Sequence, residues 1–129
     1  MKRAHLTGAA VALVVGALGL AVFPASAEAA PSNCPREHLC LYDRQHYQGR
    51  ILKLYQCGSY SLERFNHSAG QDWRDKAESI YNNQTGGALS ILYNTHFGRR
   101  VWVGELLPGQ GFPTMTSRGH RKIDYVKVC

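Results

Sequence analysis

Four cysteines offer the clearest chemistry in this sequence of 129 residues: Cys34, Cys40, Cys57 and Cys129. Thiols can bind zinc, attack substrates or form disulfides, but the chain has no Cys-x-x-Cys or His-x-x-x-His spacing that predicts a zinc site. An even number of cysteines in a small exported domain favours two disulfides, for which three pairings are possible. Cys34 and Cys40 can close a small loop, and Cys57 would then join Cys129 and attach the last residue to the fold.

The spacing of serine, histidine and carboxylate side chains does not predict hydrolytic chemistry. A serine hydrolase needs a nucleophile, a base and an orienting acid, and the sequence has no Gly-x-Ser-x-Gly turn to present such a serine. Asp72 with Asp75 or Glu78 could form the carboxylate pair of a glycosidase, but their polar neighbours are typical of a solvated turn. We therefore predict a protein that is not an enzyme and that carries no cofactor.

The amino terminus has the three parts of a secretory signal peptide. Two basic residues follow the first methionine, residues 8–23 form an apolar run without a charge, and Ala25-Ser26-Ala27 supplies the small residues of a cleavage site. The apolar run approaches the length of a membrane span, but no basic stop-transfer cluster follows it. The prediction is a signal peptide over residues 1–27, with cleavage after Ala29 as the alternative, and a secreted, extracellular mature protein without a membrane span.

The chain is basic, with a formal net charge of +6 at pH 7. A positive exported domain is attracted to anionic walls, lipids or acidic proteins, so a cationic envelope-binding or antimicrobial protein is one interpretation. The basic residues are scattered, however, and Arg99-Arg100 and Arg121-Lys122 are the adjacent pairs outside the predicted signal peptide. Because the sequence has neither a basic stripe nor a recognition motif, nucleic acid is not an expected partner.

Short segments of alternating apolar and polar residues recur from residue 38 onward, with turn residues between them. The period of two, as in Leu89, Ile91 and Tyr93, is typical of half-buried strands. We predict two sets of four strands, 39–42, 50–55, 60–62 and 77–82, then 89–93, 100–104, 112–115 and 123–128. Gln84-Thr85-Gly86-Gly87 divides the sets, and no period of 3.6 residues predicts a long helix.

The two tryptophans are interpreted either as core residues of these strands or as anchors of an interface. Trp73 is the better candidate for an anchor, because the residues on both sides of it, 70–72 and 74–75, are typical of a loop.

The two sets of strands resemble each other. The segment Tyr42 to Arg50 aligns with Tyr93 to Arg99, which is one residue shorter before its glycine, and Asp75 to Ile80 aligns with Arg121 to Val126. Each half thus starts with an aromatic hairpin corner that contains glycine, the residue that best takes a positive φ. Two four-stranded units that must cover each other's faces predict a β-sandwich.

The corners resemble the Greek-key signature of the βγ-crystallins, which is an aromatic residue, four residues, an aromatic residue, one residue and a glycine. The first corner fits it fully and the second fits it with one deletion: Tyr42, Tyr47 and Gly49, then Tyr93, Phe97 and Gly98. A Cys-Pro-x-x-x-x-Cys-Leu-Tyr segment precedes the first corner. From Cys34 to Cys129 the chain is therefore similar to the peptidase inhibitor family typified by the streptomycete metalloproteinase inhibitor.

This resemblance implies an all-β, disulfide-stapled, βγ-crystallin-like sandwich over residues 38–129, after a short segment 28–37. Its two Greek keys would span about 38–83 and about 88–129, by analogy with the two-corner pattern of the family.

The resemblance also implies a function, the inhibition of an extracellular protease, with a metalloproteinase as one candidate, by a loop that occludes its cleft. The typified inhibitor presents its reactive bond in a loop flanked by a second close pair of cysteines, which this chain lacks. By position the equivalent loop consists of Tyr93, Asn94, Thr95, His96, Phe97, Gly98, Arg99 and Arg100. The expected protein is a monomer whose partner is a protease.

Calcium binding is a second property found in crystallin-like proteins. Their calcium motif has two Asn or Asp residues, two variable residues, then Ser or Thr and Ser, and the residues Arg74 to Ser79 stand at its place. Asp75 and Glu78 could offer oxygen ligands, but Arg74 adds positive charge, and calcium takes about six to eight oxygens. The sequence favours a solvated turn, with Asp75 paired to a neighbouring base, over a metal site. A non-inhibitory structural or calcium-linked extracellular module is the alternative function.

Overall fold

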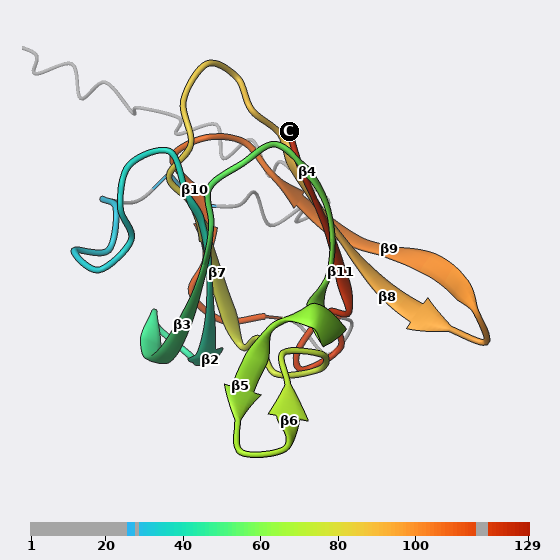
Figure 1. Cartoon of the computed structure of the whole chain (residues 1–129). Helices are drawn as coiled ribbons and strands as arrows, with labels where there is room; N and C mark the ends of the chain where they lie inside the picture. Colours follow the sequence, from blue (N-terminus) through green and yellow to red (C-terminus); the bar gives the residue numbers. More distant parts are fainter. Residues whose placement is uncertain (1–25, 28, 116–118) are drawn as a thin grey trace, which may run out of the picture.

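Two antiparallel sheets face each other and enclose the core (Figure 1). The computed structural model describes residues 26–27, 29–115 and 119–129, and the rest of the predicted signal peptide lies outside them. The five-stranded sheet has the order β1 (Ser26–Ala27), β10 (Gln110–Phe112), β7 (Ser79–Asn82), β2 (Leu39–Arg44), β3 (Gln48–Leu54). The four-stranded sheet has the order β4 (Gly58–Ser61), β11 (Tyr125–Val128), β8 (Ser90–His96), β9 (Arg99–Leu106). The prediction of an all-β sandwich is confirmed.

Each half of the chain gives its third strand to the sheet of the other half. Strand β4 follows β3 in the sequence but pairs with β11, and β10 follows β9 but pairs with β7. The two Greek keys are therefore not the independent four-stranded units that the sequence predicted. Each sheet is thus completed by a strand of the other half.

A short excursion between β4 and β7 was not predicted. It consists of a 3₁₀ turn, η1 (Leu62–Arg64), and a small hairpin of β5 (Asn66–Ser68) and β6 (Gln71–Asp72). Trp73 follows β6, donates its backbone N–H to the carbonyl of Phe65 at 3.0 Å, and is only 3% exposed. Of the two interpretations, the core residue is therefore confirmed for Trp73 and the interface anchor is not, because the excursion folds this side chain into the core. Within the described residues no helix is long and apolar enough to cross a membrane.

The core lies between the sheets, and a second apolar cluster covers the outer face of β2. All four of the first residues of β2 are buried, so both faces of this strand are covered. Leu39 and Leu41 face the other sheet, whereas Cys40 and Tyr42 pack with Cys34 on the outer side. The segment before β2 thus acts as a lid on this sheet, and its Asn33 Oδ1 accepts a hydrogen bond of 2.9 Å from the Tyr42 hydroxyl. Burial raises the pKa of Tyr42 to about 12.

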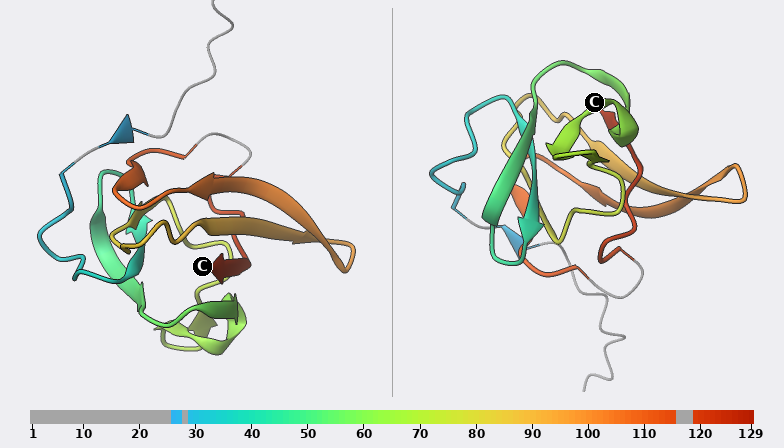
Figure 2. Two further views of the ribbon diagram at one scale, coloured as in Figure 1. Left: turned by 90° about the horizontal axis from the view of Figure 1, so that it is seen from above. Right: turned by 60° about the horizontal axis from the view of Figure 1, so that its bottom comes forward.

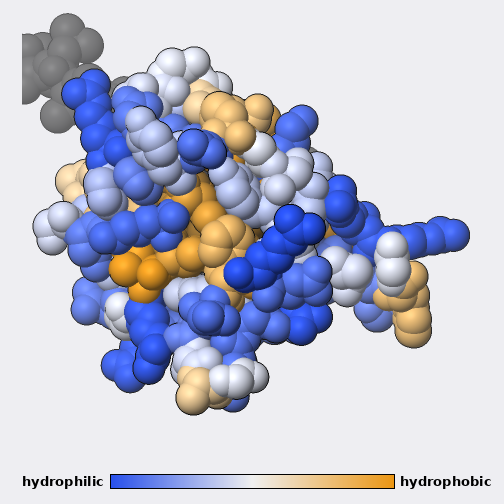
Figure 3. All heavy atoms as spheres, viewed as in Figure 1, coloured by the Kyte–Doolittle hydropathy of each residue, from blue (hydrophilic) through white to orange (hydrophobic). Residues whose placement is uncertain are grey.

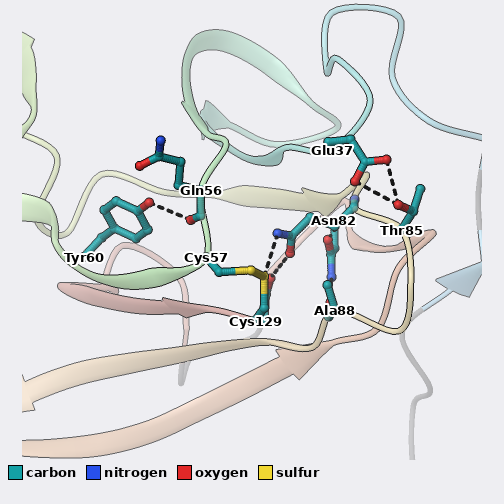
Figure 4. Close-up of a disulfide and its surroundings, with 10 residues drawn as sticks. Glu37, Gln56, Cys57, Tyr60, Asn82, Thr85, Ala88 and Cys129 are labelled. Carbon is teal, nitrogen blue, oxygen red and sulfur yellow. Dashed lines mark hydrogen bonds between the residues drawn. A yellow bond between two sulfur atoms is a disulfide. The ribbon is translucent and has the colours of Figure 1, made fainter.

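Two disulfides fasten the ends of the domain, one between Cys34 and Cys40 and the other between Cys57 and Cys129. The second spans 72 residues and ties the end of β11 to the residue before β4, as Figure 4 shows. In the chain-entropy account, closing a loop of this length stabilises the folded state by about 4 kcal/mol, and closing the short loop by about 2 kcal/mol. Both disulfides lie away from the β8–β9 turn, so that turn must obtain its rigidity from other contacts.

Candidate functional site

The first aromatic corner folds back on its own strands. Tyr47 packs edge-on against Tyr42, with ring centroids 5.5 Å apart, and its backbone N–H donates to Ser79 Oγ at 3.0 Å. Gly49 has φ +82°, and a Cβ there would collide with Asp43 Oδ1. The corner is therefore a structural element that requires glycine and that packs its aromatic ring back onto its own sheet.

The second corner does not fold back, and the prediction that Tyr93, Phe97 and Gly98 form one is wrong. Phe97 and Gly98 have φ of 48° and 72°, the two positive values of a type I′ turn. His96 pairs with Arg99 across this turn. The missing residue leaves a tight two-residue hairpin loop, so the aromatic side chain cannot reach its own sheet and is 93% exposed.

The resulting β8–β9 hairpin extends beyond the sandwich, and the residues predicted to form the inhibitory loop, 93–100, make up its outer part. Figures 1 and 2 show it projecting from the domain in every view. Phe97 stands at its tip, and Val101 and Trp102 are 48% and 49% exposed on β9. Figure 3 shows the apolar tip among polar side chains. Large apolar side chains that are exposed to solvent on a projecting hairpin are typical of a surface that binds another protein.

The base of this hairpin is fixed by β11 and by the residue before it. Asp124 accepts a hydrogen bond from the Thr95 backbone N–H through Oδ2 at 2.8 Å, and its own N–H donates to the carbonyl of Tyr93 at 3.0 Å. The guanidinium carbon of Arg100 lies 3.5 Å from the centroid of the Tyr125 ring, a cation–π contact. These contacts and the β8–β9 ladder hold the hairpin without a flanking pair of cysteines.

An aromatic row crosses the outer face of the four-stranded sheet at the level of this base. Tyr93 pairs in register with Trp102 on one side and with Tyr125 on the other. Their neighbours Leu92 and Val126 are fully buried in the core, so the alternation of a strand directs the aromatic row outward. The sequence could not identify Trp102 as exposed, since a strand that leaves the sandwich has the same alternation as one that stays within it.

A groove of about 880 Å³ lies beside the hairpin and is lined by both acidic and basic side chains. Arg74 donates to Asp72 at 2.7 Å and so holds the pKa of that carboxyl below its usual value. Asp75 instead faces Asp124. The pKa of Asp75 is raised to about 6. Partial burial is the largest cause, and a hydrogen bond to the Asp124 carboxylate is the second. The prediction that Asp75 pairs with a neighbouring base is therefore wrong.

The calcium candidates Asp75 and Glu78 do not share a site. Glu78 accepts from Arg121 Nε at 2.9 Å, and His120 Nε2 lies 3.6 Å from the same oxygen. In the part of the chain that the structure describes, no three His, Cys, Asp or Glu side chains gather in a way that could hold a metal ion. The residues at this place thus form ion pairs and a carboxyl pair.

The structure also brings together a serine, a histidine and an aspartate that the sequence did not suggest. His67 Nε2 lies 2.8 Å from Asp43 Oδ2, and its Nδ1 lies 3.2 Å from Ser68 Oγ. The Ser68 hydroxyl donates to Gln71 at 3.3 Å, and Arg50 donates to the His67 carbonyl at 2.7 Å. These bonds attach the β5–β6 hairpin to the first corner, which is a structural role.

Comparisons with known proteins agree with this architecture. A family model described as peptidase inhibitor family I36 matches residues 27–103, more than half of the chain. A search of the curated proteins gave no match.

Among solved structures, a βγ-crystallin domain from Clostridium beijerinckii is 19% identical, with a TM-score of 0.53 over 70% of this chain and 95% of that one. A structure reported as "Evolution of the eye lens beta-gamma-crystallin domain fold" is 16% identical, with a TM-score of 0.59 over 78% and 93%. The N-terminal domain of protein S is 16% identical, with a TM-score of 0.50 over 71% and 94%. At these identities the structures show the fold, which is that of a βγ-crystallin domain.

Proposed function

The chain belongs to peptidase inhibitor family I36, and from this premise we propose that it inhibits a secreted endopeptidase by inserting its β8–β9 hairpin into the substrate cleft. The observation that carries the proposal is the exposure of Phe97, 93%, at the tip of a two-residue turn. A protein gains nothing in its own stability from an aromatic side chain held in water. Such a residue is best explained by a partner that buries it.

The hairpin has the stiffness that tight binding requires. A flexible loop loses freedom on binding, at a cost of about 0.5–1.5 kcal/mol for each ordered side chain. Here the turn geometry, the β8–β9 ladder and the bonds of Asp124 to Tyr93 and Thr95 fix the backbone before a partner arrives. The ordering cost of the backbone is thus met during folding.

The same ladder explains how the protein would resist digestion. If the protease cut the peptide bond after Phe97, the two new ends would stay on paired strands, with Arg100 still stacked on Tyr125. A cleaved hairpin that keeps its shape leaves the cleft slowly. The protein then behaves as an inhibitor, although its bond can be hydrolysed.

Tyr, Trp and Arg side chains lie below the tip, towards the sheet, and would form the rest of the interface. These residue types dominate the binding energy of protein interfaces, and Trp102, Arg100 and Tyr93 lie together at the hairpin base. We place the contact on this side of the four-stranded sheet.

The organisation that accompanies this function is a signal peptide over residues 1–27, a short segment 28–37 and a single two-Greek-key domain over residues 38–129, secreted as a non-catalytic monomer. Cleavage after Ala27 would remove the edge strand β1 and leave that sheet with β10, β7, β2 and β3. Two disulfides in a small domain support an oxidising, extracellular destination.

A titration of the purified, disulfide-intact protein against thermolysin, and in parallel against subtilisin, tests the proposal. We expect the activity of one of these protease classes to fall with added protein and to level off at a stoichiometric end point. If neither class is slowed at micromolar concentration, the proposal is wrong for both classes.

A further inference from the structure

The outer edge of β9 is open along the part of the strand that carries the exposed apolar side chains. Strand β9 is an edge strand of the four-stranded sheet. Among the described residues it pairs with β8 on one side and with no strand on the other. Exposed edge strands are usually short or carry a proline, a bulge or charged side chains, because their free N–H and C=O groups recruit other strands. Strand β9 has eight residues and no proline, and its charged residues Arg99, Arg100 and Glu105 flank the apolar side chains of Val101 and Trp102.

The register shows which backbone groups of β9 face outward. In an antiparallel pair, the residues that flank a two-residue turn exchange hydrogen bonds, and those next to them point away from the partner strand. His96 and Arg99 flank the turn, so the N–H and C=O of Arg100 point outward. Two residues further along, the same alternation directs those of Trp102 outward.

Bonds on the other side of β8 support this register independently. Thr95, the partner of Arg100, donates its N–H to Asp124, and Tyr93, the partner of Trp102, accepts from Asp124 through its carbonyl. Both groups therefore point away from β9. Paired residues of this type turn their polar groups to opposite sides. Two donors and two acceptors on β9 therefore have no partner among the described residues, and they are spaced as an added strand requires.

We propose that Arg100 and Trp102 bind the target protease through their backbone, by pairing the free edge of β9 with an extended strand that lines the protease cleft. This inference rests on the proposed function and adds the contact by which the hairpin is recognised. Endopeptidases hold their substrates as extended strands, so the wall of the cleft presents the complementary donors and acceptors. The pairing would align the Trp102 side chain beside the cleft while Phe97 enters it.

A second copy of the chain is a poorer occupant of this edge. In the register centred on the open groups of Arg100, antiparallel pairing of two β9 strands would bring Arg99 and Arg100 of one copy close to those of the other. The edge therefore disfavours self-pairing in this register, while it leaves the backbone of Arg100 and Trp102 available to another strand.

Proline at position 100 separates backbone recognition from side-chain recognition. Proline is tolerated at an edge where its missing N–H would face outward, so Arg100→Pro keeps the β8–β9 ladder. Arg100→Ala removes the same guanidinium but keeps the N–H, and it is the matched control. We expect inhibition of the sensitive protease to weaken at least about tenfold more for Arg100→Pro than for Arg100→Ala. Equal inhibition constants for these two variants would overturn the proposal.

Amide hydrogen exchange in the unsubstituted protein gives a test that needs no variant. The amides of Arg100 and Trp102 should exchange rapidly in the free protein and become protected in the protease complex, whereas Val101, bonded to β8, should be protected in both. Binding without protection of these two amides overturns the edge pairing and leaves the proposed function intact. No binding to either protease class overturns both, and protection in the free protein that grows with its concentration assigns the edge to a second copy.

Discussion

Replacing Phe97 with alanine separates the fold from the proposed activity more cleanly than any other single change. Because the side chain is 93% exposed, its loss should alter the free energy of unfolding by less than about 0.5 kcal/mol. If the protease buries the ring fully, the complex loses about 1.5–3 kcal/mol of apolar transfer free energy. This corresponds to an inhibition constant that is about 10- to 150-fold weaker.

The assay is the inhibition constant against the sensitive protease, measured beside thermal unfolding of the free variant. Tyr55→Ala is the matched control, since Tyr55 is another aromatic side chain with high exposure, 61%, but lies after β3 near the Cys57–Cys129 disulfide. We expect Tyr55→Ala to inhibit like the unsubstituted protein. If Phe97→Ala inhibits equally well, or if both variants lose the same affinity, the hairpin tip is not the binding site.

Three further changes test the support of the hairpin and of the domain. Gly98→Ala should lower the free energy of unfolding by about 1 kcal/mol, because an L-residue is strained at φ +72° even though a Cβ there meets no atom within 4 Å. Urea unfolding measures this change, and an unchanged midpoint would contradict the turn assignment. Replacing Cys57 and Cys129 by serine should lower the free energy of unfolding by up to about 4 kcal/mol. The variant should therefore melt at a lower temperature, and a melting temperature equal to that of the unsubstituted protein would refute this. The pKa of Asp75 is raised from 3.8 to about 6 in the folded state, so the stability contributed by its protonated form is complete below about pH 4 and is lost as the pH rises through 6. Since the side chain is largely solvated, this pH-dependent part of the free energy of unfolding should be less than about 1 kcal/mol. It should be absent in Asp75→Asn. Identical pH profiles of stability for the two proteins would show that Asp75 does not titrate against Asp124.

The strands could be predicted from the sequence because their signal is local. Each of the eight predicted segments overlaps a strand. The alternation around Leu89 and Tyr93 marks the position of β8, but the buried face carries Ser90 and Leu92 instead. The exchange of β4 and β10 between the sheets could not be predicted from alternation, since a strand has the same pattern in either sheet. The β5–β6 hairpin was missed because Asn66 to Asp72 are mostly polar and do not alternate.

The sequence indicates where the hairpin over residues 93–100 lies in the chain, but not its shape. The predicted segment 93–100 does form the outer part of the projecting hairpin. One missing residue, however, changes a folded corner into a type I′ turn, and a sequence alignment with a gap hides this change. The meeting of Asp75 with Asp124 depends on two loops that are 49 residues apart, so no local pattern could have indicated it.

Competition for the protease cleft tests the central claim most directly. The protein, labelled with a fluorophore, is titrated with the sensitive protease, first with the cleft free and then with the cleft filled by a small active-site inhibitor. Occlusion by the β8–β9 hairpin predicts that the filled protease no longer binds the labelled protein. Equal binding to the free and the filled protease would place the contact outside the cleft and contradict the account.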